Sequence, residues 1–334
     1  MREPLFWSNT PKRPGWQARL LAPLGGIYAK ATQSRVNKTD GYKASVPVIC
    51  IGNINAGGTG KTPTTIALAQ RLIGMGKTPH VVSRGYGGTL EGPVQVSERT
   101  HKAEETGDEP LLLAAFAPTW VSKDRAEGVR AAEAAGADVI LLDDGFQNAS
   151  VQKDASVIVV DAHRGFGNGR CIPAGPLREP VAAGMARGDV VLSIGNDAAQ
   201  VRFAETWGTQ VTLPHAKGAL VPLQTGMDWT ETPFFAFAGI GHPEKFFETL
   251  RSLGATLVHT EALADHQALP PAMLSRLYAE SQKMGAQLVT TEKDAVRLPL
   301  EVRPQVLTLP VRLELQEWTP IDALLERIGV TGQA

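Results

Sequence analysis

The sequence predicts an α/β fold with a doubly wound, mainly parallel sheet and a second, smaller α/β domain. Three observations predict it. Short, uninterrupted apolar runs, typical of strands buried on both faces, alternate along the chain with stretches of helical periodicity. The alternation weakens at residues 207–229, where short segments contain Thr, Pro and Gly, and then restarts. The length of 334 residues also exceeds an ordinary single core.

The first α/β unit is expected to span residues 46–215. Its expected helices cover residues 62–74, where apolar side chains recur with helical spacing, and residues 124–135. A glycine-rich loop joins the first strand to the first helix. Helical crossovers between consecutive strands make a parallel sheet the expected arrangement. The expected strands are residues 46–52, 80–82, 138–142, 156–161 and 190–194.

The smaller C-terminal unit is expected to span residues 216–334. The same alternation of apolar runs and helical stretches predicts its elements. The expected strands are residues 233–238, 255–259 and 287–290, and the expected helices are residues 243–253 and 270–284.

Residues 1–45 form a basic, amphipathic segment. Cations and aromatic or aliphatic side chains interleave there, a composition that favours association with an anionic membrane surface. The alternative is a helix that packs on its own domain, and Pro23 and Gly25-Gly26 are expected to interrupt a continuous helix. The segment contains Trp7, Trp16, Leu20, Leu21, Leu24, Ile27 and Tyr28 among Lys12, Arg13, Arg19, Lys30, Arg35 and Lys38.

Composition excludes several classes of protein. Lys and Arg number 33 against 34 Asp and Glu, so a nucleic-acid partner is not favoured. Cys50 and Cys171 are the only cysteines, which argues against a disulfide framework or a structural zinc site. No run approaches the roughly 20 apolar residues of a spanning helix. No protein partner is evident from the sequence.

A glycine-rich loop between the first expected strand and helix supplies the strongest motif. Its GGTGKT core is typical of a P-loop, in which backbone amides and Lys61 bind nucleotide phosphates and Thr62 binds magnesium. Asn55 departs from the general pattern, which has glycine there. The motif predicts a P-loop NTPase fold that binds ATP with Mg²⁺. The expected nucleotide-binding residues are Asn55, Ala56, Gly57, Gly58, Thr59, Gly60, Lys61 and Thr62.

An apolar strand ends in the acid pair Asp143-Asp144, as in a Walker B segment. Ligands of doubly wound sheets lie at the carboxyl ends of the strands, so either carboxylate could bind the magnesium ion. The alternative is a capped turn after a buried strand. Chemistry alone assigns no role to Asp108, which could cap a helix, or to Arg178 and Glu179 in a proline-rich turn, and composition does not single out His266.

Seven ordered segments resemble the tetraacyldisaccharide 4'-kinase family, the lipid A 4'-kinases. The non-glycine residue at Asn55 is typical of that family. Gln267 is a departure, because a second histidine is common there. The resemblance covers residues 48–298 and rests on IGN leading into GGTGKTP, then SRGYG, GDEP, LDDGFQ, PAGPLRE, FAGIG and TTEKD.

This resemblance implies transfer of the ATP γ-phosphoryl group to the 4'-hydroxyl of a tetraacylated glucosamine disaccharide 1-phosphate, giving lipid IVA. It implies peripheral association with the cytoplasmic face of the bacterial inner membrane. It also implies that Asp108 is the general base and that His266 supports it. Lys61, Arg178 and Glu179 become active-site residues, with Glu179 near the metal.

Other functions remain possible from the motifs alone. A P-loop regulatory GTPase or metallochaperone ranks low, because the chain has no NKxD segment for guanine. A soluble small-metabolite kinase or ATP-dependent ligase on the same fold is opposed only by the N-terminal segment and the family motifs. An adaptor role would leave the P-loop and the acid pair without a purpose.

Overall fold

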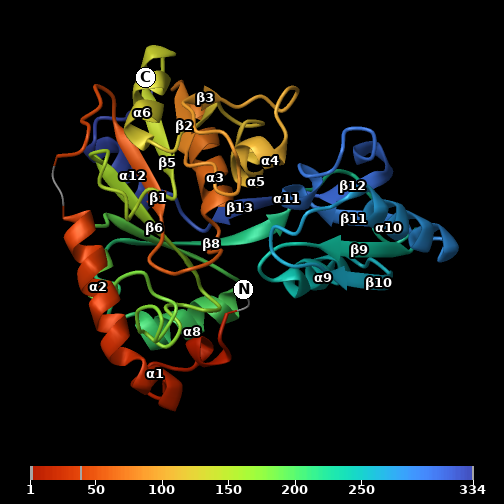
Figure 1. The fold of residues 1–334 in the computed structure, drawn as a ribbon, viewed down its shortest axis with the longest axis horizontal. Coiled ribbons are helices and arrows are strands. Elements are labelled where there is room, and N and C mark those ends of the chain that lie inside the picture. The colour runs from red at the N-terminus through yellow and green to blue at the C-terminus, as the bar shows by residue number, and fades with distance from the viewer. Residues whose placement is uncertain (1–2, 38–39, 333–334) are drawn as a thin grey trace.

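The computed structural model describes residues 3–37 and 40–332 and contains two sheets (Figure 1). Residues 1, 2, 38 and 39 of the predicted N-terminal segment, Lys38 among them, lie outside the described residues, as do residues 333 and 334 of the predicted C-terminal unit.

The larger sheet has nine strands in the order β13-β8-β7-β6-β1-β5-β2-β4-β3. Neighbours from β8 to β4 are parallel, whereas β3 and β13 add antiparallel edges. This arrangement confirms the predicted doubly wound, mainly parallel fold. The strands are β1 (Val48–Gly52), β2 (Pro79–Ser83), β3 (Val94–Gln95), β4 (Thr119–Val121), β5 (Val139–Asp143), β6 (Ala155–Asp161), β7 (Val190–Ile194), β8 (His215–Pro222) and β13 (Val311–Leu315).

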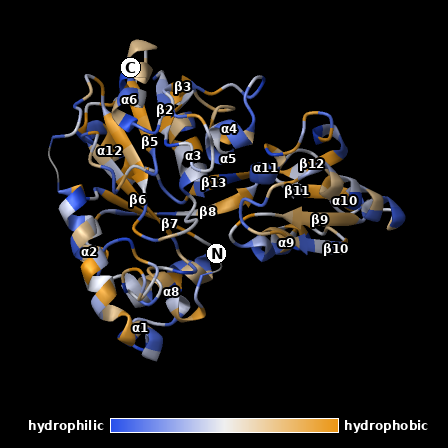
Figure 2. Cartoon of the chain, in the orientation of Figure 1, coloured by the Kyte–Doolittle hydropathy of each residue, from blue (hydrophilic) through white to orange (hydrophobic). Residues whose placement is uncertain are grey.

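Helices cover both faces of this sheet. Because side chains of a strand alternate between faces, Val48 and Cys50 of β1 join one buried cluster, and Ile49 and Ile51 join the other. Figure 2 shows hydrophobic residues along the strands of both sheets. The helices of this unit are α3 (Lys61–Gly74), α4 (Ala103–Thr106), α5 (Asp108–Leu113), α6 (Arg125–Ala134), α7 (Val181–Met185), α8 (Asp197–Trp207) and α12 (Thr319–Arg327).

The smaller sheet has four parallel strands in the order β10-β9-β11-β12. The strand expected at residues 255–259 begins two residues later and continues to Ala262. The elements are β9 (Phe234–Ala238), α9 (Pro243–Ser252), β10 (Leu257–Ala262), α10 (Pro271–Lys283), β11 (Gln287–Thr291), α11 (Glu292–Ala295), the 3₁₀ helix η2 (Arg303–Gln305) and β12 (Val306–Leu309).

The sheets do not divide the chain at residues 215 and 216, where the sequence places the junction. Strand β8 belongs to the larger sheet, and after β12 the chain returns to that sheet as β13 and α12. Leu313 of β13 and Leu324 of α12 are buried in the core of the larger sheet. This return depends on pairing between β13 and β8, segments far apart in the sequence, so the local alternation of elements does not reveal it.

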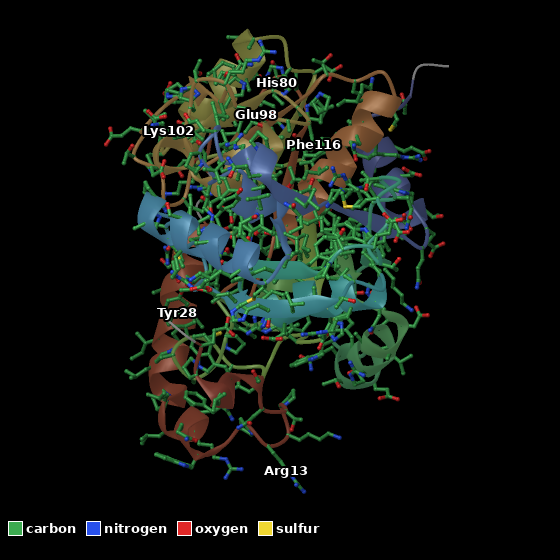
Figure 3. All side chains as sticks on the ribbon, turned by 90° about the vertical axis from the view of Figure 1, so that its right-hand side faces the viewer. Arg13, Tyr28, His80, Glu98, Lys102 and Phe116 are labelled. Carbon is green, nitrogen blue, oxygen red and sulfur yellow. The ribbon has the colours of Figure 1, made fainter. Side chains whose placement is uncertain are left out.

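The N-terminal segment forms the 3₁₀ helix η1 (Leu5–Ser8), α1 (Trp16–Leu20) and α2 (Ala22–Val36) at one flank of the larger unit (Figure 1). The helical segment is interrupted at Leu21, where α1 ends and α2 begins, two residues before Pro23, whereas Gly25-Gly26 lie inside α2 and do not break it. Pro23 stands in the first turn of α2, where a missing N–H costs no hydrogen bond. Figure 3 shows Arg13 pointing away from the body. Within the described residues no helix is long and apolar enough to cross a bilayer.

Candidate functional site

The glycine-rich loop joins β1 to α3, as the sequence predicts. Gly57 and Gly60 have φ angles of 97° and 96°, which other residues rarely adopt. Helix α3 then begins at Lys61, so Lys61 and Thr62 stand in its first turn. The free amides and positive partial charge of a helix N-terminus favour an anion there. This geometry suits the phosphates of a nucleotide.

Asn55 has a structural reason to replace glycine. Its Nδ2 donates a hydrogen bond of 3.0 Å to the carbonyl of Gly165, in the loop that follows β6. Glycine at position 55 would lose this bond. The side-chain amide of Asn55 therefore holds the loop after β6 against the P-loop.

The acid pair lies at the carboxyl end of β5, beside β1. Asp143 is buried, and Ser83 Oγ donates to its Oδ2 at 3.3 Å. Burial raises the pKa of Asp143 to about 7, although the charge of Lys61 opposes the rise. Its Oδ1 has no hydrogen-bond partner among the described residues. A buried, unpaired carboxylate oxygen at this position is suited to a cation.

Asp144 occupies a different environment. Its Oδ1 lies 3.7 Å from Lys61 Nζ and accepts a hydrogen bond of 3.1 Å from Arg178 Nη1. Burial opposes ionisation, but Lys61 and Arg178 hold its pKa below the ordinary value. Asp144 is therefore the more readily ionised carboxyl of the two.

Glu179 is buried in a second network. Arg187 Nη2 donates to both of its carboxylate oxygens at 2.6 Å, and Gln147 Nε2 donates to Oε1 at 2.9 Å. Gln147 Oε1 also accepts from Arg178 Nη1 at 3.1 Å, so Gln147 joins the two networks. The sequence assigned no role to Arg187 or Gln147. The position of Gln147 in the LDDGFQ segment was the available signal.

The residues fit a magnesium ion beside bound phosphate. Magnesium is usually held by one or two carboxylates together with phosphate oxygens and water, which Thr62 and the free Oδ1 of Asp143 would supplement. Among the residues described, no three His, Cys, Asp or Glu side chains form a metal cluster. Both carboxylate oxygens of Glu179 accept hydrogen bonds from Arg187. The place of Glu179 near the metal therefore stays a prediction.

Asp108 and His266 meet between the two units. Asp108 begins α5, and Gly107 before it lies against the backbone carbonyl of Tyr86 in the SRGYG segment. His266 Nδ1 lies 2.9 Å from Asp108 Oδ2. His266 has a φ of 57°, and its amide donates to the carbonyl of Gly239 at 3.2 Å. The left-handed backbone and this bond aim the imidazole at α5.

Lys293 and Arg297 complete this cluster, and the sequence did not identify either. Lys293 Nζ lies 3.1 Å from His266 Nε2 and 3.0 Å from Glu109 Oε1. Because an ammonium only donates, Nε2 accepts and the ring proton stands on Nδ1, where it is donated to Asp108. The hydrogen bond to Asp108 raises the pKa of His266, while burial and Lys293 oppose the rise.

Gln267, the departure from the family pattern, closes the loop around His266. Its Oε1 accepts from the amide of Ala264 at 2.8 Å, and its carbonyl accepts from Arg297 Nη1 at 2.7 Å. Arg297 Nε also lies 3.5 Å from Asp108 Oδ2. His266 is thus positioned without a second histidine.

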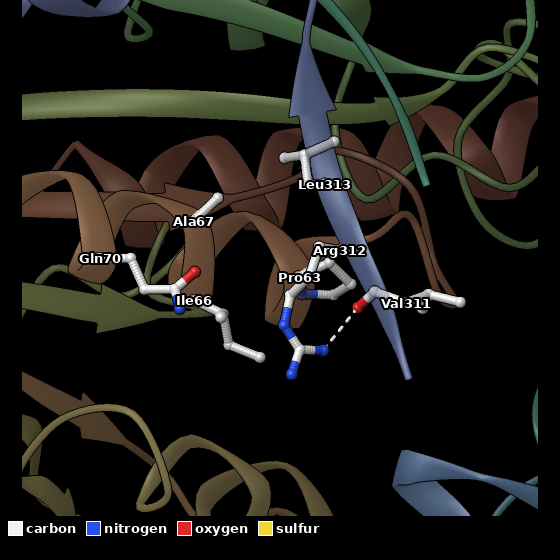
Figure 4. A pocket seen from close by; sticks show the side chains of 7 residues that line it. All are labelled: Pro63, Ile66, Ala67, Gln70, Val311, Arg312 and Leu313. Atoms are coloured by element: carbon white, nitrogen blue, oxygen red, sulfur yellow. Dashed lines mark hydrogen bonds between the residues drawn. The ribbon is translucent and has the colours of Figure 1, made fainter. Parts of the chain in front are cut away.

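A narrow hollow lies between α3 and β13 and is lined by residues of these two elements, Pro63 and Arg312 among them (Figure 4). Its volume of about 10 Å³ is only about what one water molecule needs. Arg312, at its rim, is bound to Glu292 at 2.8 Å and stacks on Phe116. This hollow is too small for a substrate.

Comparison with known proteins agrees with this geometry. The family model described as tetraacyldisaccharide-1-P 4'-kinase matches residues 17–329. The chain is 62% identical over 329 residues to the tetraacyldisaccharide 4'-kinase of Dinoroseobacter shibae, covering 98% of both chains. It is 59% identical over 328 residues to that of Jannaschia sp., covering 98% of this chain and 99% of the relative.

A crystal structure of LpxK from Aquifex aeolicus in complex with ATP has the same fold, with a TM-score of 0.74 and 26% identity, covering 93% of this chain and 99% of the other. The predicted resemblance, and with it the predicted 4'-kinase activity in lipid A biosynthesis, is confirmed. The P-loop, the acid pair and the Asp108–His266 contact lie in a chain that belongs to the tetraacyldisaccharide 4'-kinase family.

Proposed function

We propose that this kinase transfers the γ-phosphoryl group of ATP to the 4'-hydroxyl of a tetraacyldisaccharide 1-phosphate, giving lipid IVA, with Asp108 as the general base. The hydrogen bond between Asp108 and His266 is the main observation in support. A relative of the same fold is known in complex with ATP, which supports ATP as the donor.

The phosphates would lie on the loop of residues 55–62, with Lys61 at the terminal phosphates. Thr62 and Asp143 would hold magnesium, with Asp144 beside it and Glu179 further out. Bound magnesium would neutralise negative charge on the group being transferred. Asp144 and Arg178 orient Lys61 through the ion pairs described above. Phosphoryl transfer depends chiefly on such positioning and neutralisation.

Asp108 is suited to accept a proton. Its Oδ2 is bound to His266 and lies near Arg297, which leaves Oδ1 for the sugar hydroxyl. The Nδ1 proton of His266 fixes the carboxylate in place and stabilises its charge before the transfer. Lys293 fixes the opposite ring nitrogen. The base is therefore held from two sides by groups of the smaller α/β unit.

The N-terminal helices would bring the enzyme to its acylated substrate at the cytoplasmic face of the inner membrane. Their apolar side chains are more than half exposed at Leu5, Trp16, Leu20, Leu24 and Ile27. Exposed Arg13, Arg19 and Lys30 stand on the same segment, and Figure 3 shows Arg13 at its outer end. Aromatic and aliphatic groups beside cations suit the boundary between headgroups and acyl chains.

The experiment that tests this proposal identifies the phosphorylated position. Purified enzyme, ATP, Mg²⁺ and tetraacyldisaccharide 1-phosphate are combined in detergent, and the product is analysed by ³¹P NMR and mass spectrometry. We expect one new phosphate monoester, at the 4' position. A diphosphate at position 1, or hydrolysis of ATP without a phosphorylated lipid, would contradict the proposal.

A further inference from the structure

The N-terminal segment reaches the P-loop through the side chain of Glu3. A β-carbon added at Gly57 would lie 2.9 Å from Glu3 Oε1 and 3.8 Å from Arg164 Nη1. Glu3 and Arg164 form an ion pair. A carboxylate and a guanidinium therefore stand together against the loop that binds the phosphates.

The hydrogen bond from Asn55 to the carbonyl of Gly165 also helps to position Arg164. Arg164 lies in the loop after β6, and the carbonyl of the next residue, Gly165, accepts from Asn55 Nδ2. The amides of Arg164 and Gly165 also donate to the carbonyl of Asp161, at 3.1 and 2.8 Å, in a tight turn. The guanidinium thus belongs to a loop that is fixed against the P-loop by a buried side chain.

The charge of Arg164 needs an anion. The side chain is three-quarters buried, and burial lowers its pKa. Within residues 3–37 and 40–332, Glu3 is the one carboxylate in ion-pair distance of its guanidinium. The planar guanidinium of arginine is suited to bind phosphate through two hydrogen bonds, and Arg164 stands next to the phosphate-binding loop.

The turn that bears Arg164 also contacts the smaller α/β unit. Lys245 Nζ of α9 binds Asp161 Oδ2 at 2.8 Å, at the start of the same turn. Burial lowers the pKa of His242, at the N-terminus of α9, and the charges of Arg164 and Lys245 lower it further, whereas Asp161 and Asp265 oppose the shift. The turn that bears Arg164 is therefore bonded to α9 of the smaller unit.

We propose that Arg164 binds the terminal phosphoryl group of ATP and neutralises its charge during transfer, and that Glu3 competes with that phosphate for the guanidinium. The Glu3 carboxylate and the phosphate cannot both pair with the Arg164 guanidinium at the same time. Binding of ATP then releases Glu3 from the P-loop. This role uses the kinase activity of the family and is independent of which residue acts as the base.

The N-terminal segment has further contacts with the same loop, so a structural role for Arg164 must be separated from phosphate binding. The amide of Asn168 donates to the carbonyl of Trp7 at 2.9 Å, and Trp7 Nε1 donates to the carbonyl of Pro173 at 3.1 Å. These bonds do not involve the Arg164 side chain. Removal of the guanidinium should therefore leave the segment attached.

The test compares affinity for ATP and ADP by isothermal titration calorimetry and turnover in the full-length enzyme. We expect Arg164→Met to weaken ATP binding at least tenfold, to leave ADP binding within about twofold and to lower kcat about 100-fold or more, as for other phosphate-binding arginines. Arg164→Lys should restore part of kcat. The control is Arg202→Met, at an exposed arginine on α8, which should change none of these values.

Glu3→Gln tests the competition. We expect it to strengthen ATP binding several-fold with ADP binding unchanged. The proposal is overturned if Arg164→Met weakens ATP and ADP equally, since that indicates a structural effect, or if it changes neither ATP affinity nor kcat. Unchanged ATP affinity in Glu3→Gln overturns the competition.

Discussion

Asp108 Oδ2 and His266 Nδ1 lie 2.9 Å apart although 158 residues separate them in the sequence. Asp108 belongs to the larger α/β unit, and His266 lies in the smaller one between β10 and α10. The proposed general base is therefore held in place only when both units are present. On this proposal, the contact makes the position of the smaller unit a condition for catalysis.

The Asp108–His266 pair predicts a specific loss of turnover. We expect Asp108→Asn to lower kcat by about 10²–10⁴-fold, the usual contribution of a positioned base, with the Kd for ATP nearly unchanged. His266→Ala should give a smaller loss, because it positions the base without accepting the proton. Steady-state kinetics and ATP titration measure both quantities. Equal losses in kcat and ATP affinity would rule out the general-base role.

Lys293 predicts a shift in the pH profile. Its charge opposes the rise in the pKa of His266, so Lys293→Met should raise that pKa further. A protonated imidazolium makes Asp108 a weaker base, and the acidic limb of the kcat profile should therefore move to higher pH. Lys293→Arg should keep the limb near its original position. Lys283→Met, at an exposed end of α10, serves as the control, and an unmoved limb in Lys293→Met would exclude this role.

The raised pKa of Asp143 predicts a dependence of stability on pH. Its folded pKa of about 7 exceeds the ordinary 3.8, so the folded state binds the proton more tightly and is destabilised as pH rises between these values. Asp143→Asn removes this effect. With a chelator present, we expect the variant to have a higher Tm than the wild type at pH 8. This corresponds to a difference in the free energy of unfolding on the order of 1–4 kcal/mol, and the difference should be much smaller at pH 5. A Tm difference independent of pH would contradict the assignment.

Two adjacent glycines of α2 predict opposite effects on stability. A β-carbon at Gly25 would lie 2.8 Å from the carbonyl oxygen of Cys171, whereas one at Gly26 would meet nothing within 4 Å. We expect Gly25→Ala to lower the Tm. Gly26→Ala should raise the free energy of unfolding by about 0.5–1 kcal/mol, because alanine favours a helix interior. Similar Tm values for the two variants would show that α2 does not pack closely on this loop.

The exposed face of the N-terminal helices predicts binding to lipid. Trp16→Ser with Leu20→Ser should reduce sedimentation with anionic vesicles at least several-fold, since each change removes exposed apolar surface. Activity on substrate dispersed in detergent should change little. The control is Val201→Ser, at an exposed apolar residue on α8. Equal binding by the wild type and the double variant would exclude this face as the membrane contact.

Local patterns predicted much of the fold. Apolar runs and helical spacing placed the central strands and α3, because each is determined by residues close together in the sequence. The glycine-rich loop was recognised for the same reason. The pairing of β13 with β8 was not predicted, because the sequence of a short strand does not determine which edge of which sheet it joins.

Contacts across the chain limited prediction of the site. The resemblance, and no pattern in the residues themselves, brought Asp108 and His266 together. Lys293 lay within the quoted TTEKD segment, but its bond to His266 depends on how α11 faces the loop after β10. The position of Arg164 beside Gly57 likewise depends on the turn after β6, which a hydrogen bond from Asn55 in the loop after β1 holds in place.

Transfer of labelled γ-phosphate from ATP with magnesium to tetraacyldisaccharide 1-phosphate tests the central claim most directly. The intact protein and Lys61→Ala are compared in detergent at equal concentration. The structure predicts labelled lipid from the intact protein and little from the variant, because Lys61 stands at the start of α3 beside Asp144. Absence of labelled lipid with the intact protein while ATP hydrolysis persists, or equal transfer by both proteins, would contradict it.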